Sequence, residues 1–424
     1  MKDKKTKIEL VAPAGNFKKM KYALAFGADA VYCGVPDFSL RQRVNDFDLK
    51  SLNSGIEYAH KLGKKVYVTL NIFAHERHLS ALKRHILWLK KAKPDALIVS
   101  DPGVLSLIKK MWPSARVHLS TQANCTNALA VKFWVKQGVE RIILAREVTL
   151  AEIKKIHKAA PRVELEYFVH GAMCMAYSGR CLLSQFFTGR GANLGDCTQP
   201  CRWKYGLNDK IKNPNDKGLM RSFFVEEDDG GSYFMNSRDL CLVEYLQDLK
   251  KAGITSFKIE GRAKSIYYVG GVTRVYRNGI DDSMLREPQH DNVWRHKAQV
   301  EELRKYQNRG LTTGFLFGKE NCEQNIEASH AECGWEFCGE VLGGKVLVHN
   351  QIFVGDILEF VPPNGDIVRY KVKKMFDDKM EEISEAHGGQ DTIVYLPMET
   401  DMPEMTLVRR MLKCRRVGKT GKWA

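Results

Sequence analysis

Short apolar and β-branched runs alternate with helical patterns from Ile8 to Glu260, and this alternation constrains the fold more than any other feature of the sequence. Strand–helix alternation of this kind predicts right-handed βαβ units and a parallel sheet. Eight strands over about 250 residues are typical of a (β/α)8 barrel. The expected strands end near Val11 and Asn71 and cover residues 30–33, 95–100, 115–122, 141–147, 163–171 and 257–260.

Two points leave the strand count and the sheet type open. A doubly wound open sheet would also alternate strands and helices, but no G-x-G-x-x-G follows the first run, so we favour the TIM-like barrel. The segment SYFMNSRDL, around Tyr233 to Asn236, could itself supply a barrel strand and change the count.

The composition of the chain changes near Cys333, where short strands begin to alternate with turn signals such as PPNGD. This pattern is typical of a small antiparallel all-β barrel or sandwich. A polar, turn-rich stretch before Ser232 predicts an inserted hairpin over the site. The expected domains are a barrel core at 1–265 containing a cysteine-rich segment at 166–203 and an insertion at 204–232, a helical extension at 266–330, a β-barrel domain at 331–412 and a basic tail at 413–424.

Polar and charged residues gather where the predicted strands end. In a barrel of this type the catalytic groups sit at the carboxyl ends of the strands. Any one of these residues is equally explained as a helix cap or a solvated loop residue, but together they indicate a site. They are Asn71, Asp101, His118, Gln122, Arg146, Glu147, His170, Asn236, Glu260 and Arg262, with Arg41 and Arg43 on the loop after the second strand.

Four cysteines after the seventh strand have the spacing C-x6-C-x15-C-x3-C, at Cys174, Cys181, Cys197 and Cys201. Four thiolates on a segment rich in glycine are suited to a metal centre, and both zinc and an iron–sulfur cluster accept such a set. The spacing matches neither the paired C-x2-C zinc pattern nor the ferredoxin runs. The spacing therefore does not identify the metal as zinc or as an iron–sulfur cluster. A third alternative is that the cysteines bind no metal and only fill space in the core.

Charge and hydropathy narrow the class of partner and the compartment. The formal net charge of +16 and the pI near 9.2 favour a polyanion, of which RNA or DNA is the obvious class. No run approaches the roughly 20 apolar residues of a membrane span, and the start of the chain has no apolar signal core. We therefore expect a cytoplasmic protein without a membrane partner, whose eleven cysteines are reduced thiols or metal ligands.

The segments EYFVHGAMC at 166–174 and YSGRCLLS at 177–184 resemble the signature of the peptidase U32 family, whose members are often called collagenase-like. The resemblance continues over nearly the whole chain. Its other parts are LVAPAGN at 10–16, GADAVYCG at 27–34, FSLRQR at 38–43, MNSRDL at 235–240, KIEGR at 258–262 and RGLTTGF at 309–315.

Within this family the chain is most similar to the members that help form 5-hydroxyuridine at the wobble position of tRNA. This resemblance implies an oxygen-independent hydroxylation with prephenate as hydroxyl source, a 4Fe–4S cluster and tRNA as partner. An electron-donor protein is a further candidate partner. Cys174, Cys181 and Cys197 match cluster cysteines across the family. Cys201 matches the tRNA-modifying branch, whereas another branch takes its fourth ligand near Cys241; we favour Cys201 over Cys241, which the pattern DLCLVEYL would place in a helix.

The implied co-substrate suggests roles for the strand-end residues. Prephenate carries two carboxylates, which bidentate arginines bind well, so Arg41, Arg43 and Arg262 are its candidate anchors, with Lys258 and Glu260 beside them. His170 could move a proton or support the cysteine loop through a hydrogen bond. The predicted catalytic residues are His170, Glu260 and Arg262, and the predicted substrate-binding residues are Arg41, Arg43, Lys258 and Arg262.

Four other functions fit parts of the sequence. A peptidase or collagenase would need an activated nucleophile or a metal-bound water, and neither H-E-x-x-H nor G-x-S-x-G is present. A ribosomal RNA cytidine hydroxylase and an enzyme of ubiquinone synthesis are related possibilities, and the basic charge disfavours the second. A zinc-stabilised RNA-binding protein explains the charge and the cysteines but not the polar strand ends.

Overall fold

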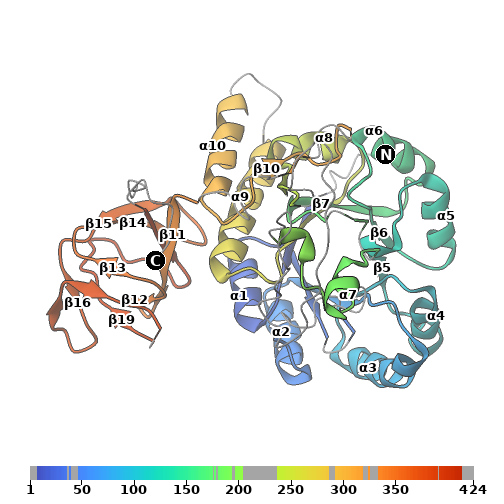
Figure 1. Ribbon diagram of the computed structural model, residues 1–424, viewed down its shortest axis with the longest axis horizontal. Coiled ribbons are helices and arrows are strands. Elements are labelled where there is room, and N and C mark those ends of the chain that lie inside the picture. The colour runs from blue at the N-terminus through green and yellow to red at the C-terminus, as the bar shows by residue number, and fades with distance from the viewer. Residues whose placement is uncertain are drawn as a thin grey trace, which may run out of the picture. The chain divides into compact units, whose positions relative to one another are not determined.

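The computed structural model describes residues 7–35, 38–39, 46–174, 176–177, 180–192, 196–203, 236–285, 292–318, 323–324, 333–389 and 391–412, with backbone alone at 283–285 and 292–295. Arg41, Arg43, the insertion 204–232 and the basic tail lie outside these residues. The chain divides into two compact units (Figure 1). The first comprises Met1–Phe17, Asp29–Ala263 and Asn308–Ala331, and the second comprises Lys18–Ala28, Lys264–Gln307 and Glu332–Ala424.

A closed parallel barrel forms the centre of the first unit, which confirms the predicted TIM-like fold and its eight strands. Neighbouring strands pair in parallel in chain order, and the last barrel strand pairs with both the seventh and the first, so the ring closes. The strands are β1 (Glu9–Pro13), β2 (Ala30–Gly34), β3 (Lys65–Leu70), β4 (Ala96–Val99), β5 (Val117–Leu119), β6 (Arg141–Ile143), β7 (Glu164–Gly171) and β9 (Ser256–Ile259).

Helices surround the outside of these strands, and side-chain caps fix where several of them begin (Figure 1). Thr149 and Glu152 form a capping box, and Asp101 accepts a hydrogen bond from the backbone N–H of Val104 at 3.0 Å. Asp101 is therefore a helix cap. The helices are α2 (Leu49–Lys61), α3 (Leu79–Ala92), α4 (Pro102–Met111), α5 (Ala128–Lys136), α6 (Leu150–Ala159) and α8 (Leu246–Lys251).

An additional strand, β8 (Asp239–Cys241), lies outside the ring of eight. It runs antiparallel to β7, with His170 opposite Cys241, and parallel to β10 (Leu311–Thr312). The segment after Asn236 thus supplies a side strand and leaves the barrel count unchanged. Cys241 lies on this strand rather than in the helix considered for DLCLVEYL, because α8 begins later, at Leu246.

A buried ion network joins the strands on both sides of the barrel closure. Arg141 on β6 is paired with Glu9 on β1 and, at 3.0 Å, with Glu166 on β7, whose other oxygen accepts from Lys258 on β9 at 2.6 Å. All four side chains are at least nine-tenths buried. Burial by itself would raise the pKa of Glu9, but Arg141 and Lys65 lower it to about 2, so its carboxylate stays charged.

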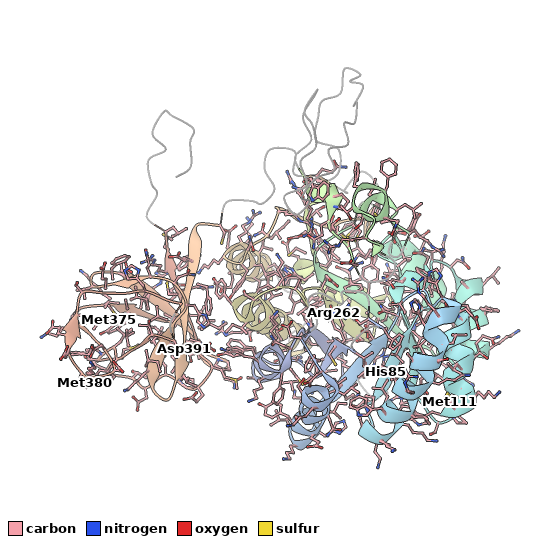
Figure 2. All side chains as sticks on the ribbon, turned by 60° about the horizontal axis from the view of Figure 1, so that its bottom comes forward. His85, Met111, Arg262, Met375, Met380 and Asp391 are labelled. Carbon is pink, nitrogen blue, oxygen red and sulfur yellow. The ribbon has the colours of Figure 1, made fainter. Side chains whose placement is uncertain are left out.

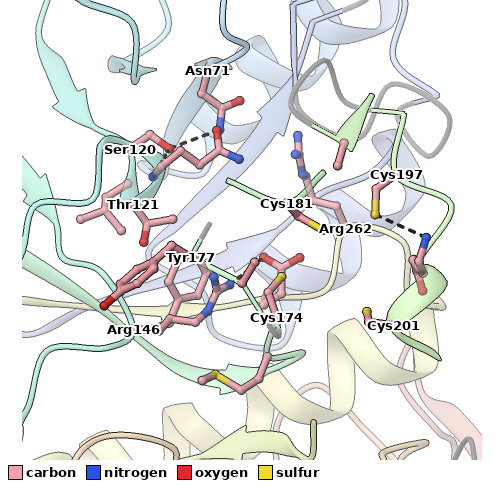
Figure 3. Close-up of a pocket in the computed structure, with 18 of the residues that line it drawn as sticks. Asn71, Ser120, Thr121, Arg146, Cys174, Tyr177, Cys181, Cys197, Cys201 and Arg262 are labelled. Atoms are coloured by element: carbon pink, nitrogen blue, oxygen red, sulfur yellow. Dashed lines mark hydrogen bonds and ion pairs between the residues drawn. The ribbon is translucent and has the colours of Figure 1, made fainter. Parts of the chain in front are cut away.

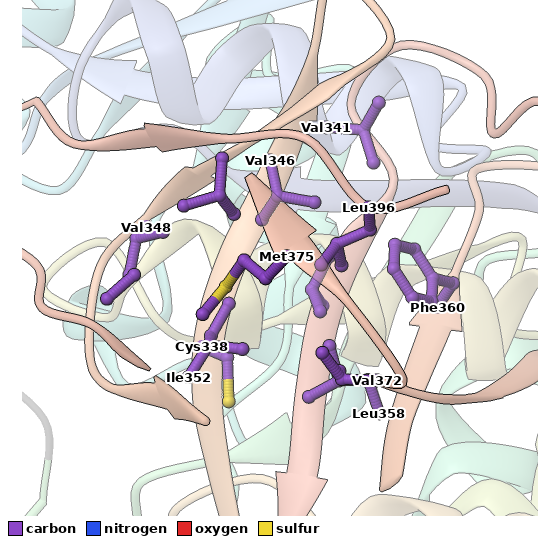
Figure 4. Packing of buried hydrophobic residues seen from close by; sticks show 13 residues of the cluster. Cys338, Val341, Val346, Val348, Ile352, Leu358, Phe360, Val372, Met375 and Leu396 are labelled. Atoms are coloured by element: carbon purple, nitrogen blue, oxygen red, sulfur yellow. The ribbon is translucent and has the colours of Figure 1, made fainter. Parts of the chain in front are cut away.

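The second unit contains an antiparallel all-β domain, as predicted for the C-terminal part. Its six-stranded sheet encloses a core that includes Cys338, Leu358 and Met375 (Figure 4). The sheet order is β15 (Val368–Lys371), β14 (Ile357–Val361), β20 (Leu407–Met411), β11 (Trp335–Leu342), β12 (Lys345–Val348) and β19 (Ile393–Val394). The smaller pairs are β13 (Ile352–Phe353) with β18 (Glu385–Ala386) and β16 (Met375–Phe376) with β17 (Glu382–Ile383).

In the described part of the second unit, three helices accompany this sheet. They are α1 (Phe17–Ala25), whose first residue belongs to the first unit, α9 (Ile266–Leu285) and α10 (Asn292–Arg304). Arg409 on β20 is fully buried and pairs with Glu302 of α10 at 2.6 Å and with Glu359 of β14 at 2.7 Å. The guanidinium therefore ties a helix to two strands of the sheet. No helix of the described residues is long and apolar enough to cross a membrane.

We predict that Arg141→Met lowers the free energy of unfolding by about 3–5 kcal/mol, because Glu9 and Glu166 then lose their shared buried partner. Arg116→Met is the matched control. Arg116 pairs with Glu140 at 2.8 Å but is 47% exposed, so its loss should cost less than about 1 kcal/mol. Denaturant unfolding measures both variants, and equal losses would contradict a structural role for the buried network.

Candidate functional site

A pocket opens where the barrel strands end, and the cysteine-rich segment forms part of its wall (Figure 3). Its empty volume is about 1240 Å³, part of which is open to solvent. Its polar and ionisable lining residues are Tyr32, Thr69, Asn71, Ser120, Thr121, Gln122, Arg146, Cys174, Tyr177, Cys181, Cys197, Gln199, Cys201, Arg202, Lys258, Glu260 and Arg262.

All four cysteines of the C-x6-C-x15-C-x3-C pattern line this pocket as free thiols. In Figure 3, Cys197 and Cys201 lie across the pocket from Asn71 and Ser120. Cys174 and Cys197 are exposed, and Cys181 and Cys201 are half-buried. Burial, together with the neighbouring thiols of Cys174 and Cys197, raises the pKa of Cys201 to about 11. The thiols are therefore close enough to interact electrostatically.

A short helix and its hydrogen bonds position the second pair of cysteines. Helix α7 (Leu183–Thr188) carries Ser184, whose hydroxyl oxygen accepts from the backbone N–H of Thr198 at 2.9 Å. Arg190 pairs with Asp196 at 2.6 Å, and the N–H of Gln199 donates to the sulfur of Cys197 at 3.4 Å. These contacts hold the loop from Asp196 to Gln199 against α7.

The donor set fits a metal centre that takes soft thiolate ligands. Burial and the neighbouring thiols of Cys174 and Cys197 raise the pKa of Cys201, and a bound metal centre would offset this by stabilising the thiolate. Four cysteines are the ligand set of a 4Fe–4S cluster as well as of structural zinc. Among the residues that the structure describes, no three His, Cys, Asp or Glu side chains are already arranged to hold a metal ion.

The structure separates the two candidates for the fourth ligand. Cys201 follows Pro200 in a short 3-10 turn and lines the pocket together with the other three cysteines. Cys241 is buried on β8, opposite His170, and is not among the described residues that line the pocket.

Arg262 is a buried cation of the pocket wall. Its side chain is 6% exposed and lies among the barrel strands, whereas His85 and Met111 lie on the outer helices (Figure 2). The guanidinium donates to the hydroxyls of Ser39 and, at 3.3 Å, of Thr69. Gly34 permits this approach, since a Cβ there would lie 2.4 Å from the Ser39 hydroxyl and 3.1 Å from Arg262.

Glu260 and Lys258 lie on the same wall. Glu260 accepts a hydrogen bond from the Tyr32 hydroxyl at 3.3 Å and pairs with Arg146 at 3.7 Å. The ammonium of Lys258 donates to Glu166 and lies 4.3 Å from the centre of the Tyr32 ring. Burial lowers the pKa of Lys258, although Glu166 opposes this effect. This wall therefore carries more positive than negative charge toward the pocket.

Several predicted site residues lie elsewhere. His170 is 2% exposed on β7, its carbonyl accepts from the N–H of Glu260 at 2.9 Å, and it is not among the described lining residues. His118 is buried inside the barrel against Tyr67, and burial, with Arg141 and Lys258, lowers its pKa well below the usual value. Asp101, Glu147 and Asn236 also lie outside the described lining, whereas Asn71, Gln122, Arg146, Lys258, Glu260 and Arg262 come together in it.

The sequence analysis did not single out several lining residues, among them Tyr32, Thr69, Phe168 and Arg202. Tyr32, Thr69 and Phe168 lie within strands, and Arg202 directly follows Cys201. Nearness to a strand end or to the cysteine pattern was the sequence signal that could have identified these residues as pocket residues. Without the barrel register, however, an inward-facing position cannot be distinguished from an outward-facing one.

Comparison with known proteins finds two family models in the chain. The model described as peptidase family U32 matches residues 15–326, and the model of the peptidase family U32 C-terminal domain matches residues 334–409.

Three curated relatives carry different names. The tRNA hydroxylation protein P of Escherichia coli is 40% identical, covering 93% of this chain and 95% of the relative. The 23S rRNA 5-hydroxycytidine C2501 synthase of Escherichia coli is 38% identical, covering 65% of this chain and 39% of the relative. A collagenase of Porphyromonas gingivalis is 32% identical, covering 73% of this chain and 74% of the relative.

We predict that metal-free protein is alkylated by iodoacetamide at the exposed Cys174 and Cys197 but not at Cys33 or Cys125. Burial raises the pKa of both Cys33 and Cys125 to about 12, so they offer little thiolate and little access. Protein purified without oxygen should be protected at Cys174 and Cys197 until a chelator is added, as peptide mass spectrometry would show. Equal labelling with and without the chelator would contradict metal ligation.

Proposed function

The chain belongs to the peptidase U32 family, and within it we propose that this protein is a tRNA-hydroxylating enzyme of the cytoplasm. The reaction we infer forms 5-hydroxyuridine at the wobble position without oxygen and takes its hydroxyl group from prephenate. A 4Fe–4S cluster bound by Cys174, Cys181, Cys197 and Cys201 completes the site.

One observation carries this proposal: four free thiols and a cationic wall share a single pocket at the carboxyl ends of the barrel strands. That position is where enzymes of this fold perform catalysis. A relative that is 40% identical over nearly its whole length is named a tRNA hydroxylation protein. The formal net charge of +16 supports a nucleic-acid substrate.

The residues of the cationic wall suit a co-substrate with two carboxylates. Arg262 offers guanidinium N–H groups at the pocket, and Arg146 lies on the same wall beside Glu260. Lys258 is bound to Glu166, so its contribution is positive charge rather than a free donor. Arg41 and Arg43 remain predicted anchors that the described residues do not include.

Two residues have candidate roles in proton transfer and positioning. Glu260 faces the pocket and is the candidate acid or base for the reacting groups. His170 is buried behind the pocket, where its backbone holds that of Glu260, which favours the supporting role over direct proton transfer. The cluster, when bound, would supply electron transfer or an iron that binds substrate directly.

The RNA would reach this pocket with one base turned out of its stack. Enzymes that modify a base extrude it into an active-site pocket or act on single-stranded substrate, and a tRNA anticodon loop is single-stranded. A protein that donates electrons to the cluster remains part of the proposal.

A peptidase is the second candidate, since the family name and a relative called collagenase suggest it. A cysteine nucleophile would need an adjacent general base. The described lining of the pocket includes no histidine, and His170 is buried outside it. The geometry therefore favours a hydroxylase over a peptidase. This holds whether the substrate is tRNA or ribosomal RNA, the substrate of the related alternative.

We predict that protein purified without oxygen contains about four iron and four acid-labile sulfide atoms per chain. Cys174→Ala should lose both, together with 5-hydroxyuridine in tRNA from a strain that lacks the native copy. Cys333→Ala is the matched control, since this half-buried thiol belongs to the second unit. Zinc without sulfide would reject the cluster, and full wobble hydroxylation in the Cys174→Ala strain would reject the role of the cysteine.

We further predict that Cys201→Ala destabilises the cluster, whereas Cys241→Ala leaves iron content and hydroxylation near the wild-type level. Cys201 lines the pocket with the other thiols, and Cys241 lies on a strand outside the described lining. Iron content, visible absorption and nucleoside analysis of the two variants distinguish them. The reverse pattern would assign the fourth ligand to Cys241.

A further inference from the structure

Four residues of the pocket lining form a polar but uncharged surface. It consists of Asn71, which follows β3, and of Ser120, Thr121 and Gln122, which follow β5 (Figure 3). We call these four residues the neutral wall. Ile98 and Ile143 line the same pocket from the neighbouring strands β4 and β6. Amide and hydroxyl groups beside apolar side chains form a surface that suits a neutral, flat, hydrogen-bonding ligand.

Hydrogen bonds inside the neutral wall fix its geometry. The hydroxyl oxygen of Ser120 accepts from the side-chain amide of Asn71 at 3.3 Å and from the backbone N–H of Gln122 at 3.4 Å. Thr121 donates its hydroxyl proton to the carbonyl of Leu144 at 3.1 Å. The loop after β5 is thereby joined to β3 and to the end of β6, so the wall is built in advance of any ligand.

Hydrogen-bonding capacity on this wall remains unused. The side-chain oxygen Oε1 of Gln122 is buried and has no hydrogen-bond partner among the residues that the structure describes. A serine hydroxyl has two accepting positions and one proton, and the two contacts to Ser120 occupy the accepting positions. An acceptor on Gln122 and a donor on Ser120 therefore lie on the same short turn after β5. A buried polar group without a partner is costly, which indicates that a ligand normally completes it.

The other wall has the opposite character. Arg262 and Arg146 present guanidinium groups there, and Lys258 adds a buried positive charge. Such a wall favours carboxylates, whereas the neutral wall gives an anion neither charge nor an excess of donors. The lining thus offers neutral polar groups as well as cationic ones, and these suit ligands of different charge.

We propose that the neutral wall is the subsite for the Watson–Crick edge of a pyrimidine base from the RNA substrate. This edge carries a donor next to an acceptor: N3–H and a carbonyl oxygen in uracil, or an exocyclic amine and N3 in cytosine. Gln122 accepts from the base and Ser120 donates to it, while Asn71 holds the Ser120 hydroxyl in place. The inference rests on the proposed function and adds which residues recognise the base.

Binding of anticodon stem-loops to the full chain tests this subsite. The probes are one loop with uridine at the wobble position, one with cytidine there and one with an abasic site. We expect the wild type to bind a pyrimidine loop about tenfold more tightly than the abasic loop, a difference of the size that one or two hydrogen bonds provide. The larger preference, for uridine or for cytidine, identifies which base the wall accepts.

Two variants of Gln122 test the residue itself. Gln122→Leu removes both polar atoms, and Gln122→Glu keeps the shape but replaces the amide by a group that accepts without donating. Gln122→Leu should bind the three loops equally while its affinity for prephenate stays within about twofold of the wild type. Gln122→Glu keeps the acceptor and should therefore keep the preference for a pyrimidine loop. Gln137→Leu is the matched control, because Gln137 is exposed after α5, on the outside of the barrel, and should keep the preference.

Arg262→Lys provides the opposite comparison and should weaken prephenate binding while the preference for a pyrimidine remains. The proposal is overturned if the wild type binds all three loops equally, or if Gln122→Leu keeps the wild-type preference. It is also overturned if Gln122→Leu loses prephenate affinity as strongly as base preference. If the protein prefers a pyrimidine loop but leaves tRNA unmodified, the proposed function is rejected and the base subsite is retained.

Discussion

The buried ion network of Glu9, Arg141, Glu166 and Lys258 is the interaction on which the rest of the barrel depends. These residues lie on β1, β6, β7 and β9, the strands at which the ring closes. Charges inside a protein are stable only when they are paired, so the loss of one member leaves another uncompensated. Closure of the barrel therefore depends on these few ionisable residues.

The pocket is built directly on this network. Lys258 is bound to Glu166 within the barrel and also lines the pocket, so the positive charge of one wall is continuous with the charges that hold the strands together. Arg262 and Arg146 extend that wall, and the amides and hydroxyls after β3 and β5 form the neutral wall. The four thiols complete the pocket from a segment held by α7 and its hydrogen bonds. Cationic groups, neutral polar groups and thiols thus share one cavity.

Sequence patterns predicted the strands well, because apolar β-branched runs and helix caps are local features. They did not predict the side strand β8, Asp239–Cys241, because the leucines of DLCLVEYL have a helical spacing. They also could not separate Asp101, a helix cap, from Gln122, a pocket residue, because both follow a strand. The irregular register between Phe168 and His170 is equally invisible in sequence. It accompanies the change from Phe168, which lines the pocket, to His170, which is outside the described lining.

By itself, the sequence determined the alternation of strands and helices, the cysteine pattern and the excess of positive charge, because each depends on residue type and local spacing. Tertiary structure decided which side chains share a pocket. Asn71, Gln122 and Arg262 are far apart in the chain and meet through closure of the barrel. Closure and register likewise place Cys201 in the pocket wall and Cys241 on a strand outside its described lining, since the direction of a side chain depends on the pairing of its backbone with distant segments.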